Sequence, residues 1–320
     1  MGTGKKAAAA AISEPAPEVV PSRTRVIPPR SMALIVAVTV LWGVNWPAMK
    51  IAVTEVPPWT FRSICVVVAG LTLLGLARLS GEPVRLERRA WLPLAVVAFF
   101  GVTAWHMFSA YGLLHMGSGR AAIVAFTMPL WVAPLSVWFL GERLDRRRVL
   151  GLLLGMVGMA ALLGPDIAQL GRAPLGALLM LGAAVSWAAA TVGTKAFDWR
   201  MGTLALSGWQ LLVGGAPIVL VWAVLEQVPD LSRLTTPGLL ALLYVVFVAL
   251  VFCFTAFIKI VRTVPANLAA LSTLAIPIVG LWSSALLLGE PVGPHEVGAL
   301  VLVVAALALV LLVPERVRAK

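Results

Sequence analysis

The sequence is dominated by long stretches without charged residues, each long enough to cross a lipid bilayer as a helix. Such stretches of about 20 apolar residues recur along the chain, and short basic connectors separate them. Hydrophobic residues make up 60% of the 320 positions and charged residues only 12%, whereas a soluble domain is about half apolar and a quarter charged. The chain is therefore expected to be an integral membrane protein.

Backbone polar groups inside a bilayer must be hydrogen-bonded within the protein, so helices rather than open strands are expected in these stretches. Ten transmembrane helices are predicted, at 31–53, 57–77, 90–114, 119–140, 149–164, 174–194, 201–225, 236–258, 264–288 and 297–313. The fold class is thus an all-α integral membrane protein. Residues 1–30 are rich in Ala, Pro, Ser and Arg and are expected to form a disordered cytoplasmic tail; residues 314–320 form a second cytoplasmic tail.

The basic residues predict the orientation of the spans. With the N-terminus in the cytoplasm, 20 of the 25 Lys and Arg residues fall in cytoplasmic connectors and tails, and only Arg172 and Arg233 fall in outer connectors. Both termini are therefore expected in the cytoplasm, with the protein in a bacterial inner membrane. The net charge of +11 follows these connectors and forms no continuous polar surface, which argues against nucleic acid as a partner.

The two halves of the chain share a pattern of residues at a nearly fixed offset. Matches lie 145 residues apart for Trp42–Trp187 and Lys50–Lys195, and 148 residues apart for Pro129–Pro277 and for Gly141-Glu142 with Gly289-Glu290. Because each half contains five spans, the second copy must enter the membrane upside down. Two inverted five-helix repeats are therefore predicted, at 31–164 and 174–313. Inverted repeats around a midplane site are typical of secondary transporters.

These motifs also resemble those of a known family. The stretch Leu41–Lys50, followed by Pro58 and Arg62, is similar to the opening of EamA-type members of the drug/metabolite transporter superfamily. Ala110–Leu114, Pro129, Gly141-Glu142-Arg143 and Gly155–Gly158 resemble the close of that family's repeat.

The resemblance implies ten helices in two inverted repeats and export of amino acids or other metabolites. Within the family, the chain looks most like the amino-acid exporters, including those for aromatic amino acids. Its second half departs from the pattern at Ala188, Pro291 and Val292, so the two halves need not contribute equally.

No enzymatic motif, cofactor site or metal site is predicted. Gly2–Lys6 lacks the spacing of a nucleotide-binding loop, and Cys65 and Cys253 are isolated in apolar stretches. All fourteen Asp and Glu residues fall in tails, connectors or helix ends. A carrier of cations usually keeps a carboxylate within the bilayer, so the pattern argues against export of cationic drugs.

Four charged or titratable residues lie within or beside the spans. His106 is either a hydrogen-bonded packing residue or a substrate contact or proton carrier. Lys50, Arg62 and Arg120 either extend to the headgroups or form an electropositive vestibule for a substrate carboxylate. Lys50 is the first choice for that contact.

A set of deep polar and aromatic residues completes the predicted substrate site: Asn45, Trp46, Trp105, Tyr111, Thr127, Trp187, Tyr244 and Ser272. Each could instead be a packing residue, and each hydroxyl could bond to its own helix. Pro129 and Pro277 each free a carbonyl one turn earlier and are assigned to bending or gating. Gly151, Gly155 and Gly158 predict close helix packing, within a monomer or in a homodimer.

The sequence therefore predicts an exporter of small metabolites, with neutral and aromatic amino acids as the leading substrates. Alternatives are an exporter of drugs or nucleotide sugars, or a membrane scaffold that transports nothing.

Overall fold

The structure is a computed structural model. It describes residues 29–141, 146, 149–151, 153–158, 161, 175–227, 234–256 and 266–311. The predicted tails lie outside the described residues, apart from residues 29 and 30, which open the first helix. The side chains of Pro129, Lys195 and Ser272 also lie outside the description.

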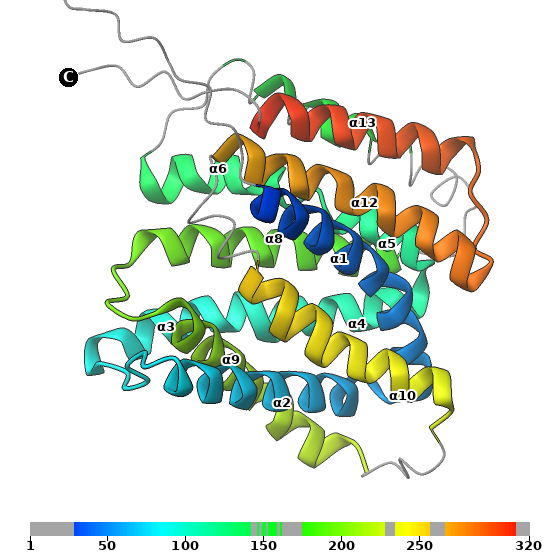
Figure 1. The fold of residues 1–320 in the computed structure, drawn as a ribbon. Helices are drawn as coiled ribbons and strands as arrows, with labels where there is room; N and C mark the ends of the chain where they lie inside the picture. Colours follow the sequence, from blue (N-terminus) through cyan, green and yellow to red (C-terminus); the bar gives the residue numbers. More distant parts are fainter. Residues whose placement is uncertain are drawn as a thin grey trace, which may run out of the picture.

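Every regular element in the described ranges is helical, as predicted (Figure 1). The first half contains α1 (Pro29–Glu55), α2 (Pro58–Leu79), η1 (Arg88–Ala90), α3 (Trp91–Ala98), η2 (Phe99–Ala104), α4 (Trp105–His115), α5 (Ser118–Ala125) and α6 (Met128–Leu140). The second contains α8 (Leu175–Ala196), α9 (Thr203–Leu225), α10 (Thr236–Leu243), η4 (Tyr244–Cys253), α12 (Ala266–Leu288) and α13 (Pro294–Leu311).

Seven of the described helices are long and apolar enough to cross a membrane. Some combine several elements: the third predicted span runs through η1, α3, η2 and α4, as Arg88–His115. Shorter apolar stretches occur at Val149–Gly158, within α12 at Ile276–Leu288 and within α13 at Pro294–Ala306. Where both ends are described, the helices start and end within a few residues of the predicted spans. The description covers the fifth, sixth, eighth, ninth and tenth predicted spans only in part.

The helices lie side by side in one bundle (Figure 1). α2 packs along α9. α1 packs against α12 and against α10 and η4, whereas α8 packs against α5 and α6 and against α3, η2 and α4. The main contacts of α1 and α8 therefore join one half of the chain to the other.

The contact of α1 with α12 depends on a small residue. A Cβ atom on Gly43 would overlap the side chain of Val279. Gly43 also stands four residues before Pro47, whose missing N–H leaves the Gly43 carbonyl without its usual intrahelical donor. Close packing through glycine is a common means of association for helices in lipid, where no hydrophobic force drives them together.

Two helices end on glycines in the left-handed region. Gly141 after α6 and Gly289 after α12 both have φ of 66°. A side chain with a Cβ is strained in this conformation, so glycine is preferred just beyond the last helical turn. These are the glycines of the matched Gly-Glu motifs.

Two spans contain π-helical segments, which sequence reasoning missed. η2 begins at Phe99 and η4 begins at Tyr244, which are 145 residues apart. A π-helical turn widens the helix and leaves carbonyl groups open to other donors. The indole Nε1 of Trp42 in α1 donates to one such carbonyl, that of Ala249 in η4, at 3.1 Å.

The predicted fourth span is interrupted rather than continuous. α5 ends at Ala125 and α6 begins at Met128, with the chain turning at Phe126 and Thr127. Pro129 lacks the N–H that would bond to the Ala125 carbonyl, which explains a break at this point. By contrast, α12 continues through Pro277 without interruption.

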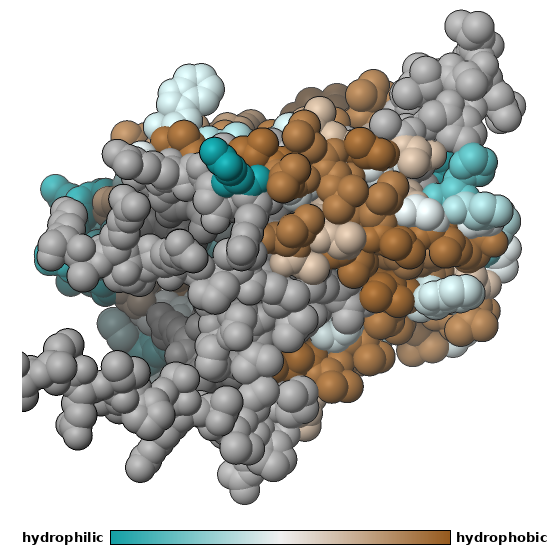
Figure 2. All heavy atoms as spheres, turned by 90° about the horizontal axis from the view of Figure 1, so that it is seen from above, coloured by the Kyte–Doolittle hydropathy of each residue, from teal (hydrophilic) through white to brown (hydrophobic). Residues whose placement is uncertain are grey.

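The outer surface carries many large apolar side chains. Leu71, Leu220, Val224 and Leu286 are all more than half exposed. On the face seen in Figure 2, hydrophobic residues cover much of the described surface, and hydrophilic residues gather mainly toward its ends. This distribution is expected for a bundle surrounded by lipid.

Candidate functional site

The structure brings several of the predicted aromatic residues together across the two halves. The rings of Trp105 in α4 and Trp187 in α8 lie 4.9 Å apart, centre to centre, and are tilted by 57°. Both side chains are partly buried. The pair thus joins the third span to the sixth through two large apolar surfaces.

Two other predicted residues contact or belong to α1: Tyr244 binds its backbone, and Trp46 lies within it. Tyr244 at the start of η4 donates its hydroxyl hydrogen to the Leu41 carbonyl at 2.8 Å. Trp46 is almost fully buried, and its ring meets that of Phe126 edge-on at 6.3 Å. These contacts hold α1 against η4 and against the turn between α5 and α6.

Asn45 in α1 has an unusual environment. Its Oδ1 is buried and accepts no hydrogen bond from the described residues. A buried carbonyl oxygen without a donor costs free energy, and native structures rarely leave one unpaired. Asn45 is therefore a position where a donor from a bound molecule would be stabilising.

The remaining predicted residues lie farther apart. Tyr111 in α4 packs edge-on against Trp59 near the start of α2, with ring centres 6.5 Å apart. Thr127 Oγ1 donates a hydrogen bond to the Val124 carbonyl at 2.7 Å, which is the bond to its own predicted helix that was the alternative to a substrate contact. The same oxygen accepts a hydrogen bond from Trp131 Nε1 at 3.3 Å. Ser272 is in α12, with its side chain outside the description.

His106 has the geometry of a hydrogen-bonded packing residue. Its side chain is buried, and Nδ1 lies 2.8 Å from the Val102 carbonyl, one turn earlier. Its own carbonyl accepts from Arg62 Nε at 3.1 Å and from Ser109 Oγ at 3.2 Å. A role in proton or substrate transfer stays a prediction.

The three cations near the spans have different environments. Lys50 donates from Nζ to the carbonyls of Leu113 and, at 3.1 Å, Met116, at the C-terminal end of α4. Arg120 lies 3.7 Å from Glu296. Arg62 is only 1% exposed, so of its two predicted roles, extension to the headgroups is wrong. Its guanidinium points into the protein because backbone and side-chain acceptors of α4 receive its N–H groups.

Sequence reasoning missed a set of glutamates that bind the N-terminal ends of helices in the opposite half. Glu226, after α9, accepts from the backbone N–H groups of Trp59 at 3.2 Å and Thr60 at 2.8 Å. The residue before α2 is Pro57, which has no side-chain oxygen to cap the helix. Glu226 supplies that oxygen instead.

The same arrangement occurs at α5. Glu290, after α12, accepts from the backbone N–H groups of Ser118 at 2.7 Å and Gly119 at 2.9 Å, and from Ser118 Oγ at 2.9 Å. The residue before α5 is Gly117, which also lacks a capping side chain.

Two further glutamates join the halves in this way. Glu55, the last residue of α1, accepts from the backbone N–H of Thr235 at 3.0 Å, just before α10. Glu82, after α2, accepts from the Ala205 N–H at 3.3 Å, in the first turn of α9. We call the contacts of Glu55, Glu82, Glu226 and Glu290 the carboxylate clasps. A clue in the sequence was that each glutamate directly ends or follows a long apolar stretch.

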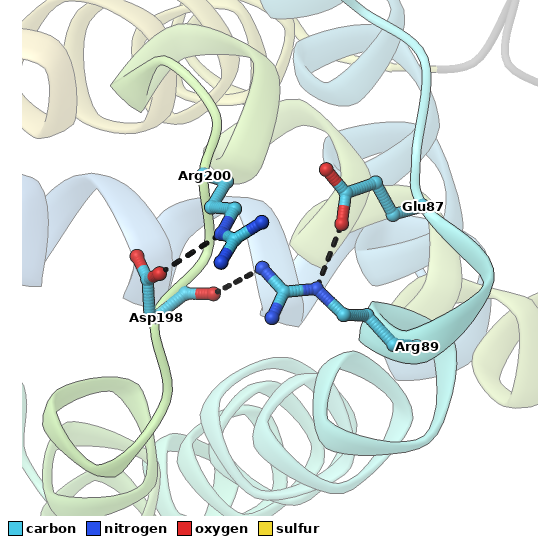
Figure 3. A network of polar contacts seen from close by, with 4 residues as sticks. All are labelled: Glu87, Arg89, Asp198 and Arg200. Carbon is cyan, nitrogen blue, oxygen red and sulfur yellow. Dashed lines mark hydrogen bonds and ion pairs between the residues drawn. The ribbon is translucent and has the colours of Figure 1, made fainter.

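The end of the bundle with Glu82 carries a second polar network (Figure 3). Arg89 binds Glu87 at 2.7 Å and reaches the Asp198 carbonyl at 3.5 Å, while Arg200 binds the Asp198 carboxylate at 3.2 Å. An open surface cavity of about 580 Å³ lies beside this loop, lined by Pro83, Phe197, Asp198, Trp199, Arg200, Met201, Gly202, Thr203 and Leu206. It lies at helix ends and not at the predicted midplane site.

No group of three or more His, Cys, Asp or Glu residues in the described part of the chain is placed to hold a metal ion. Asn45 Oδ1 is one of several buried polar atoms without a hydrogen-bond partner among the described residues, with Ser63 Oγ, Trp222 Nε1 and Thr255 Oγ1. Other groups of interest are the buried Arg62 guanidinium and the aromatic pair Trp105–Trp187. These groups can contact an apolar or zwitterionic small molecule by stacking and by hydrogen bonds.

Comparison with known proteins agrees with this architecture. A Bacillus subtilis (strain 168) protein named Uncharacterized transporter YvbV is 29% identical over 283 residues, which are 88% of this chain and 91% of that protein. A Salmonella typhimurium protein named Probable amino-acid metabolite efflux pump is 27% identical over 287 residues, which are 86% and 92% of the two chains. One solved crystal structure matches the fold with a TM-score of 0.63 and 22% identity, covering 88% of this chain and 97% of that one.

A family model matches the chain twice, over residues 29–164 and 174–312. Its description is the EamA-like transporter family, and the two matches together span most of the sequence. The resemblance found in the motifs around Trp42 and Gly141 is thereby confirmed. This multi-pass membrane protein belongs to the EamA-like transporter family.

Proposed function

We propose that this transporter exports small metabolites, with neutral and aromatic amino acids as its substrate class. Alternating access would occur between two inverted five-helix repeats, residues 31–164 and 174–313. The substrate class is supported by the relative named as a probable amino-acid metabolite efflux pump and by the aromatic side chains between the halves.

The observation that carries the proposal is the pattern of helix packing. If α8 is the counterpart of α1, then the contacts of α1 with α12 and with α10–η4 correspond to the contacts of α8 with α5–α6 and with α3–η2–α4. The contact between α2 and α9 corresponds to itself. If corresponding helices of the two halves make corresponding contacts, each half can adopt the conformation of the other. That exchange would convert an inward-facing transporter into an outward-facing one.

Local backbone features support the same correspondence. The π-helical segments begin 145 residues apart, the offset that also relates Trp42 to Trp187. The left-handed glycines Gly141 and Gly289 lie 148 residues apart. The double match to one family model adds a third, independent line of support.

The substrate would lie near the midplane, between α1, α4, α8 and η4. Trp105 and Trp187 offer aromatic surface for a side chain, and Asn45 Oδ1 offers an acceptor for an ammonium group. Trp46, His106, Tyr111, Thr127, Tyr244 and Ser272 remain candidate contacts, and Pro129 and Pro277 candidate hinges. Lys50 as the carboxylate contact also stays a prediction, and its bonds to the end of α4 favour a capping role.

The absence of an intramembrane acid favours a substrate that is not a simple cation. In the described part of the chain, Asp and Glu residues lie at helix ends or in connectors, as Glu55, Glu82, Glu226 and Glu290 do. The basic connectors support an orientation with both termini in the cytoplasm of a bacterial cell. The clasps of Glu55, Glu226 and Glu290 would then lie on the outer side.

Uptake by purified protein in proteoliposomes tests the proposal. A panel of labelled amino acids and one lipophilic cation is measured with and without an imposed pH gradient. Saturable flux of amino acids without the cation is the expected result. Flux of the lipophilic cation alone, driven by the gradient, would contradict the amino-acid proposal and favour drug export.

A further inference from the structure

The side chain of Arg62 is the most deeply buried cation in the described part of the chain. It lies in the second turn of α2 and is only 1% exposed, so its positive charge is removed from both water and lipid headgroups. A guanidinium stays charged in proteins and carries five N–H donors. An ionised group inside a membrane span is costly and usually serves function.

The partners of Arg62 within the described residues are all uncharged. Nε donates to the His106 carbonyl at 3.1 Å, and Nη2 donates to Ser109 Oγ at 2.8 Å. The Phe61 ring lies 4.6 Å from the guanidinium carbon. No carboxylate of the described residues lies within ion-pair distance of Arg62. A buried charge is normally balanced by an opposite charge. Because the positive charge of Arg62 has no such counter-charge among the described residues, an anion bound beside it would be stabilised.

The hydrogen-bonding capacity of Arg62 is also incompletely used. Nη1 donates to none of the described residues, and the third contact of the group is Nη2 to Met49 Sδ at 3.5 Å. A thioether sulfur is a weak acceptor. A carboxylate could take the place of the Met49 sulfur as the acceptor. It would then accept one N–H from Nη1 and one from Nη2, which is the paired contact that the planar guanidinium favours.

An unpaired acceptor lies on the same face of the neighbouring helix. Asn45 precedes Met49 by four residues in α1, so the two side chains lie about one turn apart on one face. The Asn45 Oδ1 is buried and has no donor among the described residues. A free guanidinium edge and a free amide oxygen are complementary to the carboxylate and ammonium groups of a zwitterion.

We propose that Arg62 binds the carboxylate of the transported molecule and that Asn45 accepts from its ammonium group. The inference rests on the proposed function and defines its substrate class as molecules that carry both groups. Lys50 is the weaker candidate for this role, because its ammonium already donates to the carbonyls of Leu113 and Met116 at the end of α4.

A purely structural role for Arg62 has different consequences. If the side chain only ties α2 to α4, its replacement lowers the flux of all substrates alike or prevents folding. If it binds the substrate carboxylate, its replacement specifically abolishes the preference for molecules that carry this group. The ratio of affinities for an acid and its amide therefore separates the two roles.

The first test uses the wild-type protein in proteoliposomes with labelled phenylalanine. Unlabelled phenylalanine, phenylalaninamide and phenethylamine compete for uptake. Phenylalanine should compete roughly 10- to 100-fold better than the amide, since a hydrogen bond to a charged group contributes on that scale. Equal competition by the three compounds would overturn the inference. Absence of any amino-acid flux would instead refute the proposed function on which it rests.

The second test repeats the competition with Arg62→Gln, after size-exclusion chromatography confirms folding. The acid-over-amide ratio should fall to about one. Arg78→Gln is the matched control, because it removes the same charge from the exposed last turn of α2, and it should keep the ratio. A folded Arg62→Gln protein that keeps the wild-type ratio would show that the inference is wrong.

Two more variants complete the test. If Arg62→Gln does not fold, the competition is measured with Arg62→Lys instead. This variant keeps the charge without the planar fork, so the acid-over-amide ratio should fall, and an unchanged ratio contradicts the inference.

Lys50→Met removes the nearby cation and should keep the acid-over-amide ratio even if total flux falls. A ratio lost in Lys50→Met but kept in Arg62→Gln would transfer the role to Lys50.

Discussion

Glu226 Oε2 accepts two hydrogen bonds from Thr60, one from the backbone N–H and one from Oγ1, each at 2.8 Å. These residues belong to different halves of the chain, 166 positions apart. The glutamate binds the first turn of α2 in the way that a capping residue within the same helix would. Because Pro57 cannot supply this cap, the stability of α2 depends on the position of α9.

Removal of the Glu226 clasp should destabilise the protein. Glu226→Ala leaves the N–H groups of Trp59 and Thr60 without their acceptor and should cost about 1 kcal/mol. Glu226→Gln should cost less, since an amide oxygen can still accept. Thermal unfolding in detergent, followed by tryptophan fluorescence, measures both. Glu87→Ala, in an exposed pair with Arg89, is the control and should change little.

The Glu290 clasp should show energetic coupling between the halves. Ser118 donates to Glu290 from both its backbone N–H and its Oγ. The single variants Glu290→Ala and Ser118→Ala both remove the side-chain bond, so their effects on the free energy of unfolding should not add. A double-mutant cycle should give a coupling of about 0.5–3 kcal/mol. Strict additivity would mean that the side-chain bond contributes nothing.

The packing of α1 on α12 should be sensitive to one methyl group. In Gly43→Ala the new Cβ overlaps Val279, and overpacking of this kind costs about 1–3 kcal/mol. Val279→Gly removes both overlapping atoms, Cβ and Cγ1, and should restore part of the lost stability in the double variant. Gly75→Ala in α2, where no atom lies within 4 Å of the added Cβ, is the control. Equal free energies of unfolding for Gly43→Ala and Gly75→Ala would contradict the close contact between Gly43 and Val279.

The aromatic pair should affect transport if it faces the substrate. Trp187→Ala removes the ring that lies 4.9 Å from Trp105, and loss of one aromatic contact should raise KM for phenylalanine by roughly 3- to 10-fold. Trp91→Ala breaks a comparable pair with Trp209, in which Trp91 is exposed, and should leave KM unchanged. A KM that is unaffected in Trp187→Ala would restrict this pair to a packing role.

The sequence by itself determined the helical membrane architecture and the positions of most spans. These properties depend on local composition, because about 20 apolar residues must form a helix in lipid wherever they occur. The family was visible in the motifs around Trp42 and Gly141. The correspondences of Trp42 with Trp187 and of Gly141 with Gly289 were also visible, since they recur at nearly the same offset in the sequence.

Only the tertiary structure decided which polar groups meet. The sequence gives the same apolar surroundings to Lys50 and Arg62, yet the fold binds Lys50 to the end of α4 and buries Arg62 among neutral acceptors. The carboxylate clasps join residues more than 120 positions apart, as in the bond of Ala205 to Glu82, and no local pattern encodes such pairs. The bond from Trp42 in α1 to the Ala249 carbonyl in the π-helical segment η4 likewise joins residues that only the fold brings together.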